Sequence, residues 1–303
     1  MPDQPLPEDP LWPRASAWLI PPAEKPHQAA IGVIGVPTHE TSITPTRADT
    51  TPAAVREALK RYSTYSASHG VDVGELTAFD FGDVRDPDGP VGEAAAMEAV
   101  WEARLRCELL LAIGGDNSLT YSVVRGLFGR QLRECGLITI DAHHDIREGI
   151  SNGSPVRRLL EAGLPGENAV QIGIADFSNS AEYARRARDA GITVLPRSAL
   201  RSSSMAGIAA QALAIAGAGG RPVFVDVDVD VCDRAEVPAC HAAAPGGISA
   251  DELRQLVFAL ASDPRVAGMD IAEVDAAADA PDGRTVRLAA LLIVEAAAGF
   301  ACR

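Results

Sequence analysis

The sequence has few cysteines and no cysteine pairing motif. Its five cysteines are scattered over 303 residues, and none belongs to a CxxC pair. An odd, dispersed set predicts neither a disulfide framework nor a zinc knuckle, and it is typical of proteins from reducing compartments. We therefore expect a cytoplasmic protein with free thiols.

Basic residues are scarce relative to acidic ones. Lysine and arginine together number 27, against 41 aspartate and glutamate residues, which gives a formal net charge of -14 at pH 7. Nucleic acids and anionic membranes bind to concentrated positive surfaces, so the composition argues against both kinds of partner. If the excess carboxylates held two divalent cations, the net charge would become about -10.

A targeting signal and a membrane-spanning run are also missing. The opening stretch MPDQPLPEDPLWPR is acidic and proline-rich where a secretory signal has a basic segment followed by an apolar one. The apolar runs LLLAIGG and AALLIVEAAAGFA are too short or too interrupted to cross a bilayer. We expect residues 1–28 to form an extended arm on the surface or on a neighbouring subunit, and residues 29–303 to form one domain.

Short β-branched runs alternate with helix-like segments after the arm. One of these segments, ISADELRQLVFALAS, has Ser249 as N-cap and Glu252 at the third helical position, the pattern of a capping box. The alternation predicts an α/β fold with a parallel sheet covered on both faces. Eight runs are expected as strands, at residues 30–36, 78–84, 109–113, 137–141, 169–175, 192–195, 222–229 and 266–274.

Polar residues follow four of the expected strands. These are the segments Gly114 to Asn117, Asp141 to His143, Asp228 to Asp233, and Glu273. Ligands of parallel α/β sheets bind beyond the carboxyl ends of the strands, where loops and helix N-termini meet. The four strand ends therefore predict one common site.

The stretch ITIDAHHDIREG (138–149) carries a candidate metal motif. A strand that ends at Asp141 and then turns can bring Asp141, His143 and Asp145 towards one point. The alternative is a capped turn, since aspartate commonly forms turns. His144 is expected to pack behind the site because it lies outside this spacing.

The stretch VDVDVDVCDR (225–234) carries a second acidic motif. Side chains alternate along a strand, so Asp226, Asp228 and Asp230 are expected on one face. Three adjacent carboxylates repel one another unless a cation holds them; the alternative is an exposed acidic edge strand. Carboxylates combined with imidazole suit Mn²⁺ better than zinc, and two bridged ions lower the pKa of a bridging water, which favours hydrolysis.

These motifs resemble the ureohydrolase family, which comprises arginases, agmatinases and formimidoylglutamases. The resemblance implies a three-layer α/β/α fold around a mainly parallel eight-stranded sheet, and a catalytic domain with two Mn²⁺ ions. It also implies hydrolysis of a C–N bond in a guanidino or formimino group, and homo-oligomers such as trimers or hexamers. The pieces that carry it, in order, are RADTTPAAVREAL (47–59), GGDNS (114–118), DAHHD (141–145), NGSPVRRLLE (152–161), DVDVCD (228–233), APGG (244–247) and DIAEVD (270–275).

The resemblance also assigns roles by position. It implies that Asp141 and Asp228 bridge the two ions, that Asp145 completes the shell of one ion, and that His143 and Asp230 complete the shell of the other. Glu273 resembles the carboxylate that receives the cationic head of the substrate. By the same analogy, Asp145 holds and relays the proton of the attacking hydroxide.

Two positions depart from the family pattern. Asn117 stands where most members have a histidine ligand, so it is a weaker candidate ligand and one ion is expected to be held less tightly. Asn152 stands where arginases and agmatinases have a histidine that shuttles protons. The guanidino-hydrolase acid is therefore missing from this loop.

Further features favour the formimidoylglutamase branch, whose members also lack the loop histidine. Arg147 matches an arginine of that branch and suits a carboxylate by bidentate pairing, although a solvated or capping arginine is the alternative. Asn179 lies in a loop that resembles the same branch. We expect hydrolysis of N-formimidoyl-L-glutamate to L-glutamate and formamide in histidine degradation, with Arg147, Asn152 and Asn179 holding the substrate carboxylates and Glu273 at the formimino nitrogen.

Two alternative functions stay open from the sequence. The first is an agmatinase or a guanidino-acid amidinohydrolase that tolerates both asparagines. The second is a non-catalytic member of the family that binds a ligand through the same pocket. Outside the motifs, His241 is expected in a loop near the pocket entrance, as a solvated histidine or, alternatively, in contact with substrate. Cys232 is expected to be a small buried thiol.

Overall fold

The computed structural model describes residues 9–22 and 28–303. Of the expected arm, residues 1–8 and 23–27 lie outside the described residues. The described part of the arm contains the short helix α1 (Ala15–Trp18) and the strand β1 (Leu19–Ile20). The division into an arm and a catalytic domain stays a prediction.

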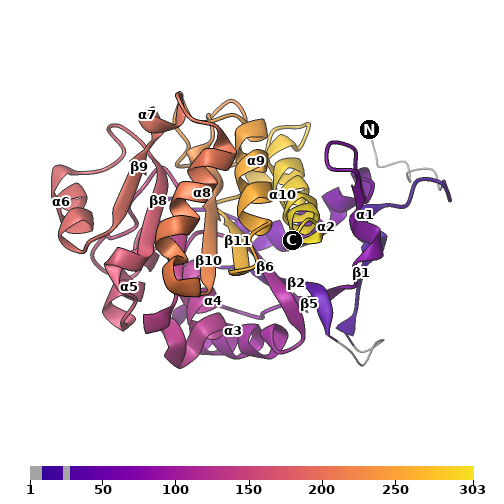
Figure 1. Ribbon diagram of the computed structural model, residues 1–303, viewed down its shortest axis with the longest axis horizontal. Coiled ribbons are helices and arrows are strands. Elements are labelled where there is room, and N and C mark those ends of the chain that lie inside the picture. Colours follow the sequence, from indigo (N-terminus) through magenta and orange to yellow (C-terminus); the bar gives the residue numbers. More distant parts are fainter. Residues whose placement is uncertain (1–8, 23–27) are drawn as a thin grey trace.

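A nine-stranded sheet runs through the centre of the molecule, and every pair of neighbouring strands in it is parallel (Figure 1). The strand order is β1-β5-β2-β6-β11-β10-β7-β8-β9. Its other strands are β2 (Ala29–Val36), β5 (Ala78–Asp83), β6 (Cys107–Gly114), β7 (Gly136–Ile140), β8 (Ala169–Ile174), β9 (Thr193–Pro196), β10 (Val223–Asp228) and β11 (Val266–Ala272).

All eight expected strands are present, but the expected strand count was one too low. The ninth strand is β1, which pairs through Leu19 and Ile20 with Ala78 and Phe79 at the edge of the sheet. Two residues carry no readable alternation, so the pattern could not predict this strand. A separate antiparallel hairpin is formed by β3 (Tyr65–Ser66) and β4 (Val71–Asp72).

Helices cover both faces of the sheet, which confirms the three-layer α/β/α architecture (Figure 1). One apolar cluster joins the sheet to helices α2, α8, α9 and α10, and a second joins its other face to α3, α4, α5 and α6. The bounds are α2 (Thr51–Ala58), α3 (Gly89–Arg104), α4 (Leu119–Phe128), α5 (Pro155–Ala162), α6 (Ala181–Asp189), α7 (Arg197–Leu200), α8 (Met205–Ala216), α9 (Ala250–Ala261) and α10 (Arg284–Ala301).

Local sequence signals explain several helix ends. The Ser249 hydroxyl accepts from the Glu252 N–H, and the Glu252 carboxylate accepts from the Ser249 N–H, so the expected capping box of α9 is confirmed. Helix α3 ends at Arg104, earlier than the run GEAAAMEAVWEARLRCEL suggested, because Cys107 already begins β6. The short 3-10 helices are η2 (Ala48–Thr50), η3 (Leu59–Arg61), η4 (Val73–Glu75), η5 (Gly129–Glu134), η6 (Gly166–Asn168), η7 (Ala218–Gly220), η8 (Val229–Val231) and η9 (Ala276–Ala278).

The C-terminal helix α10 is a packed helix of the outer layer. It lies against α9 and α2, and its buried side chains belong to the same apolar cluster as those of α9. No helix in the described ranges is both long and apolar enough to cross a membrane.

The four central strands β6, β11, β10 and β7 are direct neighbours in the sheet. They are the strands whose carboxyl ends carry the expected polar residues. Because neighbouring parallel strands end at the same edge, the fold brings these four segments to one place.

Candidate active site

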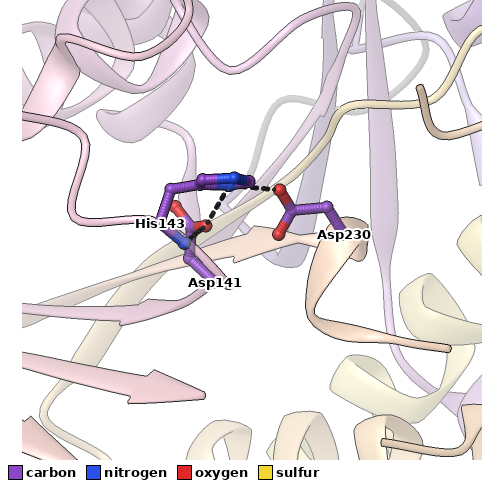
Figure 2. A group of neighbouring side chains, drawn as sticks. All are labelled: Asp141, His143 and Asp230. Carbon is purple, nitrogen blue, oxygen red and sulfur yellow. Dashed lines mark hydrogen bonds and ion pairs between the residues drawn. The ribbon is translucent and has the colours of Figure 1, made fainter. Parts of the chain in front are cut away.

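Three of the expected metal residues form a compact cluster. Ligand-type atoms of Asp141, His143 and Asp230 all lie within 4.8 Å of one another. The His143 Nδ1 atom is 2.6 Å from Asp230 Oδ2 and 3.5 Å from Asp141 Oδ1, and the three side chains point towards one another (Figure 2). Two carboxylates and one imidazole at this spacing can bind a divalent cation.

The backbone explains how the two acidic segments meet. Asp141 directly follows β7, and Asp228 is the last residue of β10. The expectation that Asp230 continues this strand was wrong, because Asp230 lies in the 3-10 turn η8, where its N–H donates to Asp228 Oδ1 at 2.8 Å. This turn aims Asp230 across to the neighbouring loop, where its Oδ1 accepts from the Ala142 N–H at 2.9 Å.

Buried carboxylates without hydrogen bonds mark the place where a cation fits. Burial, together with neighbouring carboxylates, raises the pKa of Asp141, Asp226 and Asp228 well above the ordinary value. Asp141 Oδ2 and both carboxylate oxygens of Asp226 are buried and have no hydrogen-bond partner. Buried polar atoms normally have partners, so the donor set fits one or two divalent cations.

His143 and Asp230 behave as an ion pair. Burial opposes a charge on His143, but the hydrogen bond to Asp230 outweighs this effect and raises the pKa of His143 to about 9. Burial likewise opposes ionisation of Asp230, yet the bond from His143 brings the pKa of that carboxyl below its ordinary value. In the absence of metal, the proton on His143 thus supplies part of the positive charge that a bound cation would bring to the cluster.

Asp145 and Asn117 lie directly against each other. The Asn117 Nδ2 amide donates to Asp145 Oδ2 at 2.6 Å, and Asn117 Oδ1 accepts from the Thr120 hydroxyl at 2.9 Å. Burial raises the pKa of Asp145 to about 6. Asp145 also has a left-handed φ of 53°, a conformation that costs a non-glycine residue about 1–3 kcal/mol and is often found at functional sites.

Glu273 is fixed at the end of β11 by two donors. The Asn117 N–H and the Asn152 Nδ2 amide each donate to Glu273 Oε1 at 2.8 Å. Burial raises the pKa of Glu273 to about 8, and Asp116 adds to the effect. Glu273 is the second site residue with a left-handed backbone, at φ 63°.

One pocket brings together four of the expected metal residues and the expected substrate residues. It is lined by His143, Asp145, Asp228, Asp230 and Glu273 together with Arg147, Asn152 and Asn179. Among the described residues, the exposed Arg147 guanidinium has no hydrogen-bond or ion-pair partner. Both polar atoms of the Asn179 side chain contact the backbone, since Oδ1 accepts from the His144 N–H at 3.0 Å and Nδ2 donates to the Ala142 carbonyl at 2.9 Å. Asn179 is thus placed to hold the loop beside the pocket.

Comparisons with known proteins identify the family of the chain. A family model described as the arginase family matches residues 29–299. The chain belongs to the arginase family. It is 37% identical to the formimidoylglutamase of Halalkalibacterium halodurans over 257 residues. This aligned region covers 82% of this chain and 80% of the relative.

Solved structures of arginase-family proteins have the same fold. The formimidoylglutamase of Bacillus subtilis superposes with a TM-score of 0.88 at 30% identity, over 96% of this chain and 93% of that one. An oxidized form of Trypanosoma cruzi formiminoglutamase, determined with Mn²⁺, superposes with a TM-score of 0.85 at 25% identity, over 96% and 99% of the two chains.

Some buried partners in this arginase-family site were not predicted. The Thr120 hydroxyl lies 2.9 Å from both Asn117 Oδ1 and Asp270 Oδ2. Its three-residue spacing from Asn117 was the only available signal, because Asp270 approaches from another strand. Gln171, a polar residue in the buried strand β8, has its Oε1 2.6 Å from the His144 Nδ1 atom.

The remaining residues noted in the sequence lie outside the cluster. His144 is buried against Gln171, and burial lowers the pKa of its imidazole. Cys232 is fully buried, and burial raises the pKa of its thiol. His241 lines the pocket, in keeping with its expected place near the entrance, whereas its contact with Asp275 was not predicted.

Proposed function

We propose that the chain is a manganese-dependent formimidoylglutamase that hydrolyses N-formimidoyl-L-glutamate to L-glutamate and formamide. The observation that carries the proposal is the free Arg147 guanidinium in the pocket that also holds the carboxylate and imidazole cluster. A guanidinium binds carboxylates in bidentate fashion, and the proposed substrate has two. The similarity to formimidoylglutamases supports the same reading.

The metal residues follow from the donor set. Asp141, His143, Asp145, Asp228 and Asp230 would hold the two Mn²⁺ ions, and Asn117 would join them as a weaker ligand. When bound, the ions supply a nucleophile at neutral pH by lowering the pKa of water. Support comes from the unpartnered carboxylate oxygens of this site and from the manganese in the related formiminoglutamase.

Asn117 is the weak member of this set. Its oxygen now faces Thr120 and its nitrogen faces Asp145, so the amide must turn over before the oxygen can face a cation. The Thr120 hydroxyl has one hydrogen and two acceptors in the present arrangement. After the turn, the Asn117 nitrogen donates to Thr120 and the hydroxyl donates to Asp270, which satisfies the chain of hydrogen bonds.

The remaining pocket residues position the substrate and move protons. The Glu273 carboxylate meets the cationic formimino head, and Asn152 orients Glu273 through its amide. Asp145, whose carboxylate lies in the pocket beside the other acidic residues, would take up the proton that the attacking water loses. Arg147 binds a substrate carboxylate at the exposed side of the pocket.

A substrate panel tests the proposal directly. Steady-state turnover of N-formimidoyl-L-glutamate is compared with that of agmatine, arginine and 4-guanidinobutyrate in the presence of Mn²⁺. We expect the formimino substrate to have the highest kcat/KM, and faster hydrolysis of a guanidino compound would replace the assignment by an agmatinase or guanidino-acid hydrolase. Less than one bound Mn²⁺ per chain together with no turnover would indicate a non-catalytic protein.

We also propose that the protein is a cytoplasmic homo-oligomer, either a trimer or a hexamer. Its five cysteines are free, which suits a reducing compartment. Oligomerisation is supported by the resemblance to the ureohydrolases and by the proline-rich arm. Light scattering coupled to size-exclusion chromatography measures the assembly.

A further inference from the structure

The departing amine needs a proton donor of its own. Asp145 takes up the proton that the attacking water loses, but no group has been assigned to the nitrogen that leaves the tetrahedral carbon. A side-chain amide is too weak an acid to act as a general acid at neutral pH, so Asn152 cannot fill this role. Here the Asn152 amide is moreover bound to Glu273.

His241 is placed to fill this need. It lies in the loop that follows η8 and lines the same pocket as Asp228, Asp230 and Glu273. Its side chain is 33% exposed, and its Nε2 atom is 3.1 Å from Asp275 Oδ2. The imidazole is therefore accessible to a ligand in the pocket and anchored at one nitrogen.

The anchor of His241 is itself rigidly held. Asp275 Oδ2 also accepts from the Thr46 hydroxyl and from the Arg47 N–H, both at 3.0 Å, and the Asp275 N–H donates to the Ala239 carbonyl at 3.1 Å. Burial opposes ionisation of Asp275, but these donors and His241 outweigh it and lower the pKa of the carboxyl. An ionised carboxylate can only accept, so Nε2 carries a hydrogen and Nδ1 is the nitrogen that exchanges its proton.

The other imidazoles that line the pocket are already engaged. Three imidazoles are among its described lining residues: His143, His144 and His241. His143 is paired with Asp230, and the Nδ1 atom of His144 is held by Gln171. Of these imidazoles, only His241 reaches the pocket without belonging to the metal cluster or to a buried contact.

We propose that His241, oriented by Asp275, is the proton donor to the departing amine. Water adds to the amidine carbon, and the C–N bond to the glutamate nitrogen then breaks with its electron pair moving to that nitrogen. His241 Nδ1 delivers a proton to the same nitrogen, and the hydroxyl proton of the tetrahedral carbon goes to the released amine, which leaves as the ammonium while formamide forms. The water proton that Asp145 took up then restores the proton of His241, so the step balances without an oxidant or reductant. This inference rests on the proposed function only in naming the amine that departs.

The test compares two histidine variants that are matched in their surroundings. His39 is also paired with a buried carboxylate, Asp88 at 3.3 Å, and its side chain is 35% exposed, but it does not line the pocket. His241→Gln and His39→Gln are assayed with the best substrate of the wild-type panel. General acid catalysis contributes about 10²–10⁴-fold, so we expect kcat of His241→Gln to fall by at least about 100-fold with KM little changed, while His39→Gln retains the wild-type rate.

Rescue distinguishes proton donation from a structural role. Free imidazole should restore turnover to His241→Ala in proportion to its concentration, with bound Mn²⁺ and Tm equal to those of the wild type. A rise in KM alone, an unchanged kcat, or a loss of kcat without rescue would overturn the inference. If a guanidino compound is the best substrate and His241→Gln still loses kcat, the proposed substrate is wrong and the inference stands. If the wild type hydrolyses no amidine of the panel, both are overturned.

Discussion

Without metal, the protein should lose stability as pH rises, and this can be measured without any substrate. The perturbation is removal of metal with a chelator, followed by thermal unfolding between pH 5.5 and pH 8. In the metal-free protein, burial raises the pKa of Glu273 to about 8 and that of Asp270 to about 7. The folded state then binds more protons than the unfolded state throughout this range. The stability that each of these carboxyl groups contributes is fully present below the pKa that the group has in the unfolded chain. This contribution is lost as pH rises towards the pKa of the group in the folded protein.

Glu273 gives the expected size of the effect. Its pKa moves from 4.5 to about 8, so each pH unit within the window costs about 1.4 kcal/mol, or about 3 kcal/mol from pH 5.5 to 8. Glu273 is only half-buried, so water in the pocket screens part of this effect. We expect a loss of about 2 kcal/mol, which corresponds to a fall in Tm of about 3 °C at this chain length. His143, with a pKa raised to about 9, acts in the same direction.

Two variants and the addition of Mn²⁺ test whether Glu273 causes the pH dependence of Tm. Glu273→Gln keeps the acceptor for both donors and removes the ionisation, so its metal-free Tm should depend less on pH than that of the wild type. Glu98→Gln, an exposed site on α3, should follow the wild type. Mn²⁺ binds the deprotonated ligands, so its stabilisation should grow with pH. A metal-free Tm that is constant or rises from pH 5.5 to 8 would refute the reasoning, as would a Glu273→Gln curve identical to the wild type.

Two further substitutions separate substrate binding from metal binding. Arg147→Ala should raise KM for N-formimidoyl-L-glutamate by about tenfold or more, because a charge-assisted bond contributes about 1.5–3 kcal/mol, with kcat and bound Mn²⁺ unchanged. The KM of Arg147→Lys should lie between those of the wild type and Arg147→Ala. An unchanged KM in both variants would show that Arg147 does not bind the substrate. Asn117→His should instead tighten Mn²⁺ binding, measured by titration into metal-free protein, because an imidazole nitrogen replaces an amide that must first turn over. Weaker or equal Mn²⁺ affinity would contradict the assignment of Asn117 to the metal.

The sheet and the position of the site could be predicted because their signals are local. The eight expected strands alternate with helices along the chain. The polar residues that follow β6, β7, β10 and β11 can each be recognised in the sequence next to their own strand. The strand β1 was not predicted because a strand of two residues is too short to show an alternation of apolar and polar side chains. Asp230 was placed on the strand because period two continues in the sequence past Asp228, whereas the backbone turns into η8.

The contacts between segments could not be predicted, since they depend on packing across the sheet. Thr120 meets Asp270 only because β11 lies beside β6, the strand that leads into α4. His241 meets Asp275 because the Asp275 N–H binds the Ala239 carbonyl and draws the two loops together. The left-handed backbone of Asp145 and Glu273 is likewise imposed by the fold.

Asn117 and Asn152, which stand at positions where the sequence resemblance implies histidines, share one property: both are neutral hydrogen-bond donors to a carboxylate. Asn117 donates to Asp145 and Asn152 donates to Glu273, so each amide supports a carboxylate without adding a titratable positive charge. An imidazolium at position 152, next to Glu273, would oppose the cationic head of the proposed substrate. A proton donor is still needed, and a histidine at position 241 can supply it while Asp275 balances its charge. The proton-donating role is thereby separated from the carboxylates that bind the metal and the substrate.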